Sequence, residues 1–499
     1  MGTPFKHPLT LALAMLLGAL GGWLPASSAQ ARLCPAQLTP RLEALLSQAP
    51  LDTAYTGMLL QTQGATAARH TLYARNADRL FTPASNAKLL TTAAALQFLG
   101  GSYRMRTSVY GTPGPGGLTA LRVVGRGDPS LTEVQLQALA QQLAQAGVTQ
   151  VSTLTVDDSY FPGFATNPTW EWEDAQADYG APVNSLILNQ NAVAVQVSPT
   201  QVGQPLALRW PPAFLATPWP VLNQTVTVAT AAEAMPVSLW RPGATATLEA
   251  TGRLGVDAES ITLGLAVLDP AQRFADGLRL ALADQSIPVA QVAISPPPGS
   301  LLGMAPAALP ELAAVESPPL AELLVPTNRD SNNLYAEALL KTLGVTYVEP
   351  PQTDASQAGT AAVLAVLADL GVATGSLRLA DGSGLSRHNL VTPQALVETL
   401  QVMAEQPEAE VFQNSLAVAG TSGTLRNRLR DTPLAGRLQG KSGAITGNVS
   451  LSGYVQPPDY PPLVVSIIIN HADHPASLLR ETIDAMLGLV GQLSADCSA

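Results

Sequence analysis

Lysines are rare in this chain, and two of them stand beside serines. The sequence has four lysines against twenty-two arginines. Ser85 precedes Lys88 by three residues in TPASNAKLL, and Ser442 follows Lys441 directly in GKSGAI. A lysine in an apolar setting can release its proton, whereas an arginine stays protonated in proteins. The lysines kept in such a chain are therefore candidates for a general base.

Ser85 and Lys88 are predicted to lie on one face of a helix. An apolar segment follows Pro83 and ends at Gly100, which are typical positions for a helix start and stop. Residues three apart in a helix share a face, and the first turn offers free N–H groups. A serine is a weak nucleophile until a base takes its proton. The spacing favours a nucleophile and its base, although a capped helix with a surface lysine would have the same pattern.

Two further short motifs lie later in the chain. Ser331 and Asn333 stand in RDSNNLYAEALL, just before a predicted helix, and Lys441 stands in GKSGAI on a predicted strand. Taken singly, the first is an ordinary capping serine and the second an ordinary polar strand end. The presence of both motifs after the Ser85 motif, in this order, favours an active site built from all three.

The three motifs resemble S-x-x-K, S-x-N and K-[ST]-G of the penicillin-recognising serine enzymes. The long segment between the first two resembles the class C low-molecular-mass penicillin-binding proteins, which are the D-alanyl-D-alanine carboxypeptidase/endopeptidases of peptidase family S13. Other similar stretches are GRGDPSLT at 125–132, YGAPVNSLILNQNAV at 179–193, DGSGLSRHNLVTP at 381–393 and AGTSGTLRNRL at 419–429. The RGD within the first stretch is accordingly interpreted as part of a strand and turn and not as an adhesion motif.

The resemblance implies a role for each motif residue. Ser85 would attack the carbonyl between the two terminal D-alanines of a peptidoglycan stem peptide, and Lys88 would accept its proton. Ser331 would pass a proton to the leaving D-alanine, and Asn333 would hydrogen-bond the substrate amide. Lys441 would supply a positive field near the serines.

The resemblance also implies substrate-binding residues. Ser442 would bind the terminal carboxylate, and the backbone N–H of Ala444 would complete an oxyanion hole with that of the nucleophile. Asp157 would meet the ammonium of a diaminopimelate side chain, Phe161 would line its pocket, and Arg387 would meet its carboxylate. A turn aspartate and a surface arginine are also commonplace, so these last three assignments compete with purely structural roles.

The chain departs from the family pattern at four positions. Asn332 replaces the usual aspartate of the second motif, and Ser442 replaces the commoner threonine of the third. Ala444 lacks a hydroxyl often found there, and Thr446 stands where some members have a longer polar side chain. None of these changes removes a catalytic group, but they leave the third residue of the stem peptide open.

The predicted fold is α/β. Three strands near the C-terminus, RLQGKSGAI, NVSLSGYV and LVVSIIIN, form an antiparallel meander, and helices flank it. We expect a penicillin-recognising, β-lactamase/transpeptidase-like domain from residues 32–104 and 300–499. Residues 105–299, rich in short strands, proline and glycine, are expected to be a large, mostly β insertion of two subdomains.

Composition and the N-terminus predict an exported protein. The net charge of -11 argues against nucleic acid as a partner. Residues 1–31 resemble a signal peptide, with Lys6, an apolar run and Ala29-Gln30-Ala31 before the expected cleavage site. The alternative is an uncleaved membrane anchor. No later run is apolar enough to span a membrane. The resemblance adds a bacterial, periplasmic location, with stem peptides and β-lactam antibiotics as partners.

Cysteine and histidine are sparse. Cys34 and Cys497 either form a disulfide between the two ends or remain separate thiols. His471 and His474 lack an H-E-x-x-H pattern and are interpreted as a solvated loop, so no metal and no cofactor are expected.

Three functions stay open at this stage. The best supported is a serine-type D-Ala-D-Ala carboxypeptidase, with endopeptidase as a second activity. A β-lactamase would use the same three motifs, and a peptidoglycan-binding protein could retain a catalytically weak site. The balance of the two peptidase activities and the oligomeric state are not predicted.

Overall fold

The structure is a computed structural model that describes residues 32–113, 118–210, 219–243, 247–295, 309–347 and 354–497. The predicted signal peptide, residues 1–31, lies outside the described residues. Within the described ranges, no helix has both the length and the apolar character that crossing a bilayer requires.

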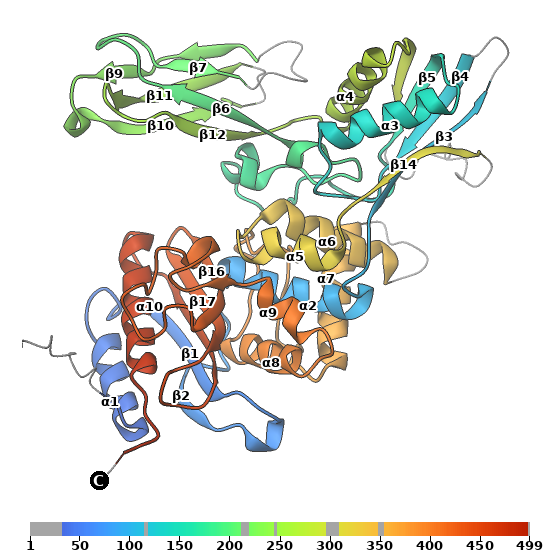
Figure 1. The fold of residues 1–499 in the computed structure, drawn as a ribbon. Helices are drawn as coiled ribbons and strands as arrows, with labels where there is room; N and C mark the ends of the chain where they lie inside the picture. The colour runs from blue at the N-terminus through green and yellow to red at the C-terminus, as the bar shows by residue number, and fades with distance from the viewer. Residues whose placement is uncertain are drawn as a thin grey trace, which may run out of the picture.

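A six-stranded sheet forms the centre of the lower part of the molecule in Figure 1. Every neighbouring pair in it is antiparallel. The order is β15 (Ala417–Val418), β16 (Leu438–Ile445), β17 (Asn448–Val455), β18 (Leu463–Asn470), β1 (Tyr55–Thr62) and β2 (Thr71–Arg75). The three predicted C-terminal strands are β16, β17 and β18, and the predicted meander is confirmed.

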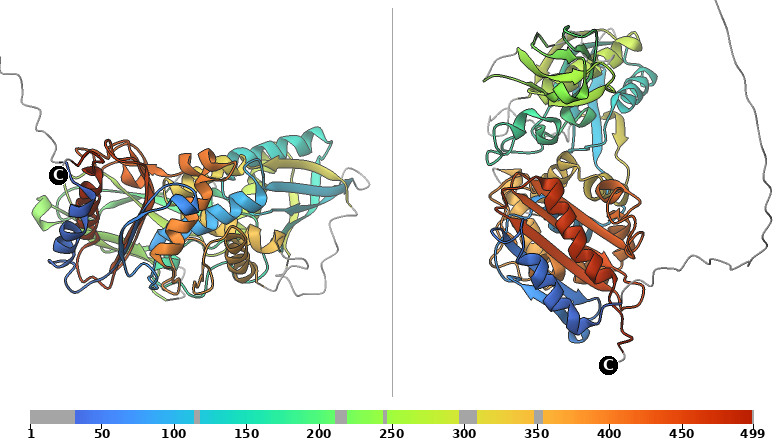
Figure 2. Two further views of the ribbon diagram at one scale, coloured as in Figure 1. Left: turned by 90° about the horizontal axis from the view of Figure 1, so that it is seen from below. Right: turned by 90° about the vertical axis from the view of Figure 1, so that its left-hand side faces the viewer.

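Helices cover both faces of this sheet. Helices α1 (Pro35–Leu46) and α10 (Ala476–Gly491) lie side by side over one face (Figures 1 and 2). The other face is covered by a helical layer made of α2 (Ala87–Leu99), α5 (Leu320–Asn328), α6 (Asn333–Thr346), α7 (Ala355–Asp369), α8 (Pro393–Ala404) and α9 (Ala409–Asn414). Because helices lie against both faces, every residue of β17 and β18 is buried.

A second sheet begins where the chain leaves α2. Its order is β13 (Val289–Ile294), β5 (Gln150–Asp157), β4 (Leu118–Val124), β3 (Arg106–Pro113) and β14 (Glu311–Glu316). Helices α3 (Glu133–Gln145) and α4 (Pro270–Asp284) share a hydrophobic core with it. The pairing of β14 with β3 carries this sheet beyond residue 299, where we expected the insertion to end.

The remaining strands of the insertion form two small sheets around a common apolar cluster. One contains β12 (Ile261–Ala266), β6 (Ala192–Ser198) and β7 (Ala207–Arg209). The other contains β10 (Met235–Trp240), β11 (Leu248–Gly255), β8 (Val221–Asn223) and β9 (Val226–Val228). The short 3-10 helices are η1 (Thr66–Ala68), η2 (Ala84–Asn86), η4 (Asp174–Gln176), η5 (Asp178–Gly180), η6 (Asn189–Asn191), η7 (Ala231–Glu233) and η9 (Gly423–Leu425).

The two ends of the described chain are joined. Cys34 and Cys497 form a disulfide, with their Cα atoms 5.7 Å apart. Leu33 also forms a bridge with Leu493, next to the C-terminal end of α10. Of the two alternatives that the sequence left open, the structure contains the disulfide.

Candidate active site

Ser85 lies in the tight turn that leads into α2. The turn is the 3-10 helix η2, and α2 continues directly from it. Ala84 has a φ of 48°, a conformation that residues other than glycine rarely adopt. Strained backbone of this kind concentrates at functional sites. Lys88, one turn further, is fully buried, and its Nζ donates to Ser85 Oγ at 3.0 Å.

Lys88 Nζ has three hydrogen-bond partners. Besides the bond to Ser85, it donates to Asn333 Oδ1 at 2.7 Å and to the Ser383 carbonyl at 2.7 Å. Burial lowers the pKa of Lys88 from 10.5 to about 7, although the nearby carboxylates of Asp381 and Glu337 oppose the shift. A lysine with this pKa is well placed to take a proton from a serine at neutral pH.

Lys441 and Ser331 form a second lysine–serine pair. Lys441 is fully buried on β16, and its Nζ donates to Ser331 Oγ at 2.8 Å and to the Ser442 carbonyl at 2.6 Å. Burial and the proximity of Lys88 hold the pKa of Lys441 well below its usual range. Ser331 stands just before α6 with a φ of 64°, a second strained residue in the site. The structure therefore brings together all three motifs, although Ser331 lies 246 positions after Ser85 and Lys441 lies 110 positions after Ser331.

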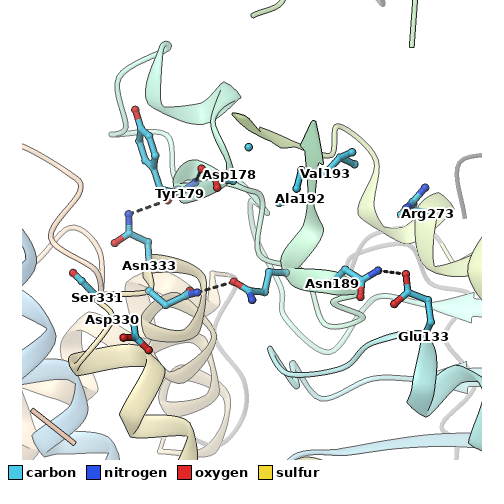
Figure 3. A pocket seen from close by; sticks show the side chains of 14 residues that line it. Glu133, Asp178, Tyr179, Asn189, Ala192, Val193, Arg273, Asp330, Ser331 and Asn333 are labelled. Atoms are coloured by element: carbon cyan, nitrogen blue, oxygen red, sulfur yellow. Dashed lines mark hydrogen bonds between the residues drawn. The ribbon is translucent and has the colours of Figure 1, made fainter. Parts of the chain in front are cut away.

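The asparagines of the second motif link the catalytic part to the insertion (Figure 3). Asn332 Oδ1 accepts from the backbone N–H of Tyr335 and caps α6, while its Nδ2 donates to Gln190 Oε1 at 2.6 Å. Asn333 Nδ2 donates to the Tyr179 carbonyl at 2.9 Å. Asn332, where the family usually has aspartate, thus works here through amide hydrogen bonds and not through charge.

Strand β16 packs tightly against the Ser85 turn. A Cβ on Gly443 would lie 2.8 Å from the Ser85 backbone nitrogen and 2.9 Å from the Pro83 carbonyl, so only glycine leaves room here. Ala444, the next residue, lines the same cavity as Ser85. Ser442 Oγ donates to Thr424 Oγ1 at 2.8 Å, which holds these two hydroxyls together.

A cavity of about 330 Å³ opens over Ser85. Ser331, Asn333 and Ala444 line it together with Arg387. Arg387 donates to Glu171 Oε1 at 2.7 Å and to the Thr446 carbonyl at 3.0 Å, so its guanidinium is already paired at the rim.

Sequence reasoning missed the acidic and aromatic wall of this cavity. Glu171, Asp174 and Tyr179 line it, and all three belong to the insertion. Asp174 Oδ1 accepts from the Tyr179 hydroxyl at 3.1 Å. Tyr179 opens one of the family-like stretches, but no periodicity or motif marks the other two residues.

Sequence reasoning also missed the buried groups behind Lys88. Glu337 Oε1 accepts the backbone N–H groups of Gly382 and Ser383 at 2.9 and 2.7 Å, which fixes the carbonyl that Lys88 contacts. Burial raises the pKa of Glu337 to about 8. Glu337 stands four residues after Asn333 on α6, so the helical repeat places both toward the same site.

Asp157 and Phe161 lie elsewhere. Asp157 is buried at the end of β5, where Arg122 forms an ion pair with it and the Ser159 N–H donates to it. Phe161 lines a separate cavity of about 220 Å³ with Asp158 and Asn184. Among the described residues that line the Ser85 cavity, neither appears. Their assignment to the substrate side chain therefore stays a prediction that this geometry does not support.

The predicted histidine loop is a surface feature. His471 and His474 line a shallow cavity next to Thr446. In the part of the chain that the structure describes, no group of three or more histidine, cysteine, aspartate or glutamate side chains could hold a metal ion.

The helix-start serine, its buried lysine and the flanking antiparallel sheet define a serine enzyme of the penicillin-recognising class. The model of the D-Ala-D-Ala carboxypeptidase 3 (S13) family matches residues 38–493, and the chain belongs to that family.

Relatives support this membership. The chain is 34% identical over 481 residues to a D-alanyl-D-alanine carboxypeptidase of Actinomadura sp. (strain R39), covering 93% of this chain and 86% of the relative. It is 27% identical to the D-alanyl-D-alanine carboxypeptidase DacB of Haemophilus influenzae, over 76% of this chain and 78% of the relative.

The solved structure of penicillin-binding protein 4 (dacB) from Haemophilus influenzae has the same fold. The superposition covers 90% of this chain and 99% of the Haemophilus chain, with a TM-score of 0.77 and 23% sequence identity. A second structure of that protein, complexed with a β-lactam, gives a TM-score of 0.71 at 22% identity, over 89% of this chain and 97% of its own.

Proposed function

We propose that this protein is a serine-type D-Ala-D-Ala carboxypeptidase that acts on peptidoglycan stem peptides through an acyl-enzyme and is acylated by β-lactams. The observation that carries the proposal is the contact of the fully buried Lys88 Nζ with Ser85 Oγ at 3.0 Å. Membership in the S13 family and the names of the relatives support the substrate class.

The contacts suggest how acylation proceeds. Unprotonated Lys88 accepts the Ser85 proton while Oγ forms a bond to the carbonyl carbon between the two D-alanines. The oxyanion that results accepts the backbone N–H groups of Ser85 and Ala444. Ser331 Oγ then gives a proton to the leaving nitrogen as the C–N bond breaks, and it takes a proton in return from Lys441 Nζ, which donates to it. Water later hydrolyses the ester on Ser85 and releases the shortened peptide.

The cavity walls indicate which substrate groups fit. We assign the terminal carboxylate to the hydroxyls of Ser442 and Thr424 and to the field of Lys441, which contacts Ser331 in the cavity wall. At the other end, Asp174 and Glu171 supply negative charge to the cavity, and Arg387 supplies positive charge. A zwitterionic side chain such as that of diaminopimelate matches this pair of charges. We assign its ammonium to Asp174, in place of the buried Asp157, and its carboxylate to Arg387.

Export to the bacterial periplasm is part of the same proposal. The N-terminal pattern resembles a cleaved signal, and the Cys34–Cys497 disulfide is typical of an oxidising compartment. Periplasmic peptidoglycan would then be within reach of Ser85.

The test is mass spectrometry of a purified pentapeptide muropeptide after incubation, with a fluorescent penicillin as a second probe. We expect loss of one alanine and a penicillin adduct on Ser85 that is absent from Ser85→Ala. Peptide mapping that finds the adduct elsewhere would contradict the nucleophile. Rapid turnover of penicillin without loss of alanine would indicate a β-lactamase, and stable labelling without loss of alanine a weak binding protein.

A further inference from the structure

A shallow cavity of about 410 Å³ lies beside the catalytic cavity, and Thr446 lines both. Gly447 and residues 471–475, the loop after β18, form the other walls of this loop cavity. In the proposed function, the catalytic cavity takes the last three residues of a stem peptide. The loop cavity has no part in that assignment.

The edge of β16 beside Ser85 is open to a peptide. Strand β15 pairs only with residues before Lys441, so in the described part of the chain Lys441–Ile445 have no strand partner on that side. Open strand edges bind extended peptides through main-chain hydrogen bonds. The proposed function also fixes the direction of the peptide, because the terminal carboxylate lies at Ser442 and the reacting carbonyl at Ala444. The peptide therefore runs antiparallel to β16, with its amino-terminal part toward Thr446.

Chain length decides which residue of the peptide reaches the loop cavity. An extended chain advances about 3.3–3.6 Å per residue, in the strand and in the substrate alike. From the reacting carbonyl at Ala444, the penultimate D-alanine and the diaminopimelate residue extend to Thr446, whose carbonyl accepts from Arg387 at 3.0 Å. The next residue of a stem peptide, the γ-linked D-glutamate, then lies beside Thr446 and Gly447. Its branch is the α-carboxyl group.

The loop is held against the turn that follows β16. The Ala472 N–H donates to the Gly447 carbonyl at 3.1 Å, and the His471 N–H donates to Asn448 Oδ1 at 3.4 Å. Asn448 Nδ2 donates in turn to the Thr446 carbonyl at 3.1 Å. The turn and the loop therefore form one wall, which continues from the catalytic cavity.

The side chains of this wall can recognise a carboxyl group. His471 and His474 are exposed there, and neither imidazole has a hydrogen-bond partner among the described residues. An imidazole N–H can donate to an oxygen of a carboxylate or of a carboxamide. Asp473 lines the same cavity, and its negative charge opposes a carboxylate but not a neutral carboxamide.

We propose that the loop cavity binds the γ-D-glutamyl residue of the stem peptide, with His471 and His474 donating to an oxygen of its α-carboxyl or α-carboxamide group; the proposal rests on the proposed function. This residue anchors the peptide on the amino-terminal side of the bond that Ser85 attacks. A peptide that lacks it keeps the chemistry at Ser85 but loses the anchor. A penicillin has no such residue and acylates Ser85 without it.

The experiment compares two peptides in the full chain by their kcat/KM for alanine release. One is the complete pentapeptide stem, and the other is its N-acetylated tripeptide, which begins at diaminopimelate. The variant is His471→Gly/His474→Ala, because glycine accepts the φ of 57° at position 471. His70→Ala is the control, since this exposed histidine lines neither cavity. A thermal melt and acylation by a fluorescent penicillin accompany each protein, and His474→Ala alone serves if the double variant melts abnormally.

We expect wild type to prefer the pentapeptide at least about tenfold, as two added hydrogen bonds allow. The double variant should lose most of this preference, with its tripeptide and penicillin rates within about twofold of wild type, and His70→Ala should change nothing. A wild type with equal kcat/KM for the two peptides would overturn the proposal while the proposed function stands. A folded variant that keeps the preference, or loses all rates equally, would also overturn it. A wild type that releases alanine from neither peptide would instead contradict the proposed function.

A pentapeptide with an amidated glutamyl residue separates the two forms of the bound group. Asp473→Asn removes a negative charge from the cavity wall. It should raise kcat/KM about twofold to threefold for the free acid and leave the value for the amide unchanged, because only the free acid is repelled. An unchanged or lower value for the free acid would overturn the placement of this group beside Asp473.

Discussion

Burial distinguishes Lys88 from an ordinary lysine. At its usual pKa of 10.5, fewer than about one Lys88 in a thousand would be unprotonated at pH 7. Removal from water lowers the pKa to about 7 and makes about half of it available as a base. The carbonyl of Ser383 and the side chain of Asn333 then hold the amine toward Ser85. The proposed chemistry thus depends on the environment of one amine.

The acylation rate should follow the titration of Lys88. Because the base works unprotonated, the second-order rate of Ser85 acylation by a fluorescent penicillin should rise with pH through about 7 and level off above about 8. Lys88→Arg keeps the positive charge and the helix propensity but cannot release its proton. It should lose at least about 10²-fold in acylation. A thermal melt checks that the variant is folded at the assay temperature. A flat profile between pH 6 and 8, or an arginine variant within about threefold of wild type, would exclude Lys88 as the base.

Two elements determine the geometry of the site. Helix α6 carries Asn333, Glu337 and Lys341 at intervals of four, so they lie on one face. Asn333 contacts Lys88, Glu337 fixes the loop that contacts Lys88, and Lys341 Nζ donates to the carbonyls of Phe164 and Val183 in the insertion. One helix face therefore links the catalytic lysine to the inserted part.

Strand β16 is the second element, and Gly443 tests its position. In Gly443→Ala the new Cβ would lie 2.4 Å from Ser450 Oγ and 2.8 Å from the Ser85 nitrogen, so the strand or the turn must shift. Displacing one oxyanion donor is expected to cost about 10²-fold in acylation. Gly488→Ala on α10 is the control, since its Cβ would meet nothing within 4 Å. Equal acylation rates in the two variants would show that β16 tolerates a side chain here.

At the scale of the molecule, the insertion completes the site and the disulfide joins the chain ends. Glu171, Asp174 and Tyr179 come from the insertion but line the catalytic cavity. The disulfide joins residues 463 positions apart in the sequence, beside α1 and α10, on the face of the sheet opposite α2. It should therefore affect stability more than catalysis.

Removing the disulfide should lower the melting temperature. A cross-link that closes a long loop restricts the unfolded chain and typically contributes about 2–4 kcal/mol. We expect Cys34→Ser/Cys497→Ser to melt lower than wild type while acylating at a similar rate at 25 °C. Reductant should lower the melting temperature of wild type and leave that of the variant unchanged. Identical melting curves for the two proteins without reductant would contradict this contribution.

Local features were predictable from the sequence alone. The contact between Ser85 and Lys88 follows from helical spacing, which acts over one turn and needs no tertiary information. The three C-terminal strands were predictable for the same reason, because their apolar runs and turns are local. The resemblance to a family added Ser331, Asn333 and Lys441 as partners.

Only the tertiary structure decided which distant groups meet. Asp157 and Asp174 are both acidic residues of the insertion, and no local pattern shows which one faces the cavity. The register of β4 on β5 places Arg122 beside Asp157 and neutralises it, while a short 3-10 helix brings Asp174 to the rim. The low pKa of Lys88 and the pairing of Cys34 with Cys497 likewise arise from packing, because burial and proximity between segments are properties of the folded chain and not of its local sequence.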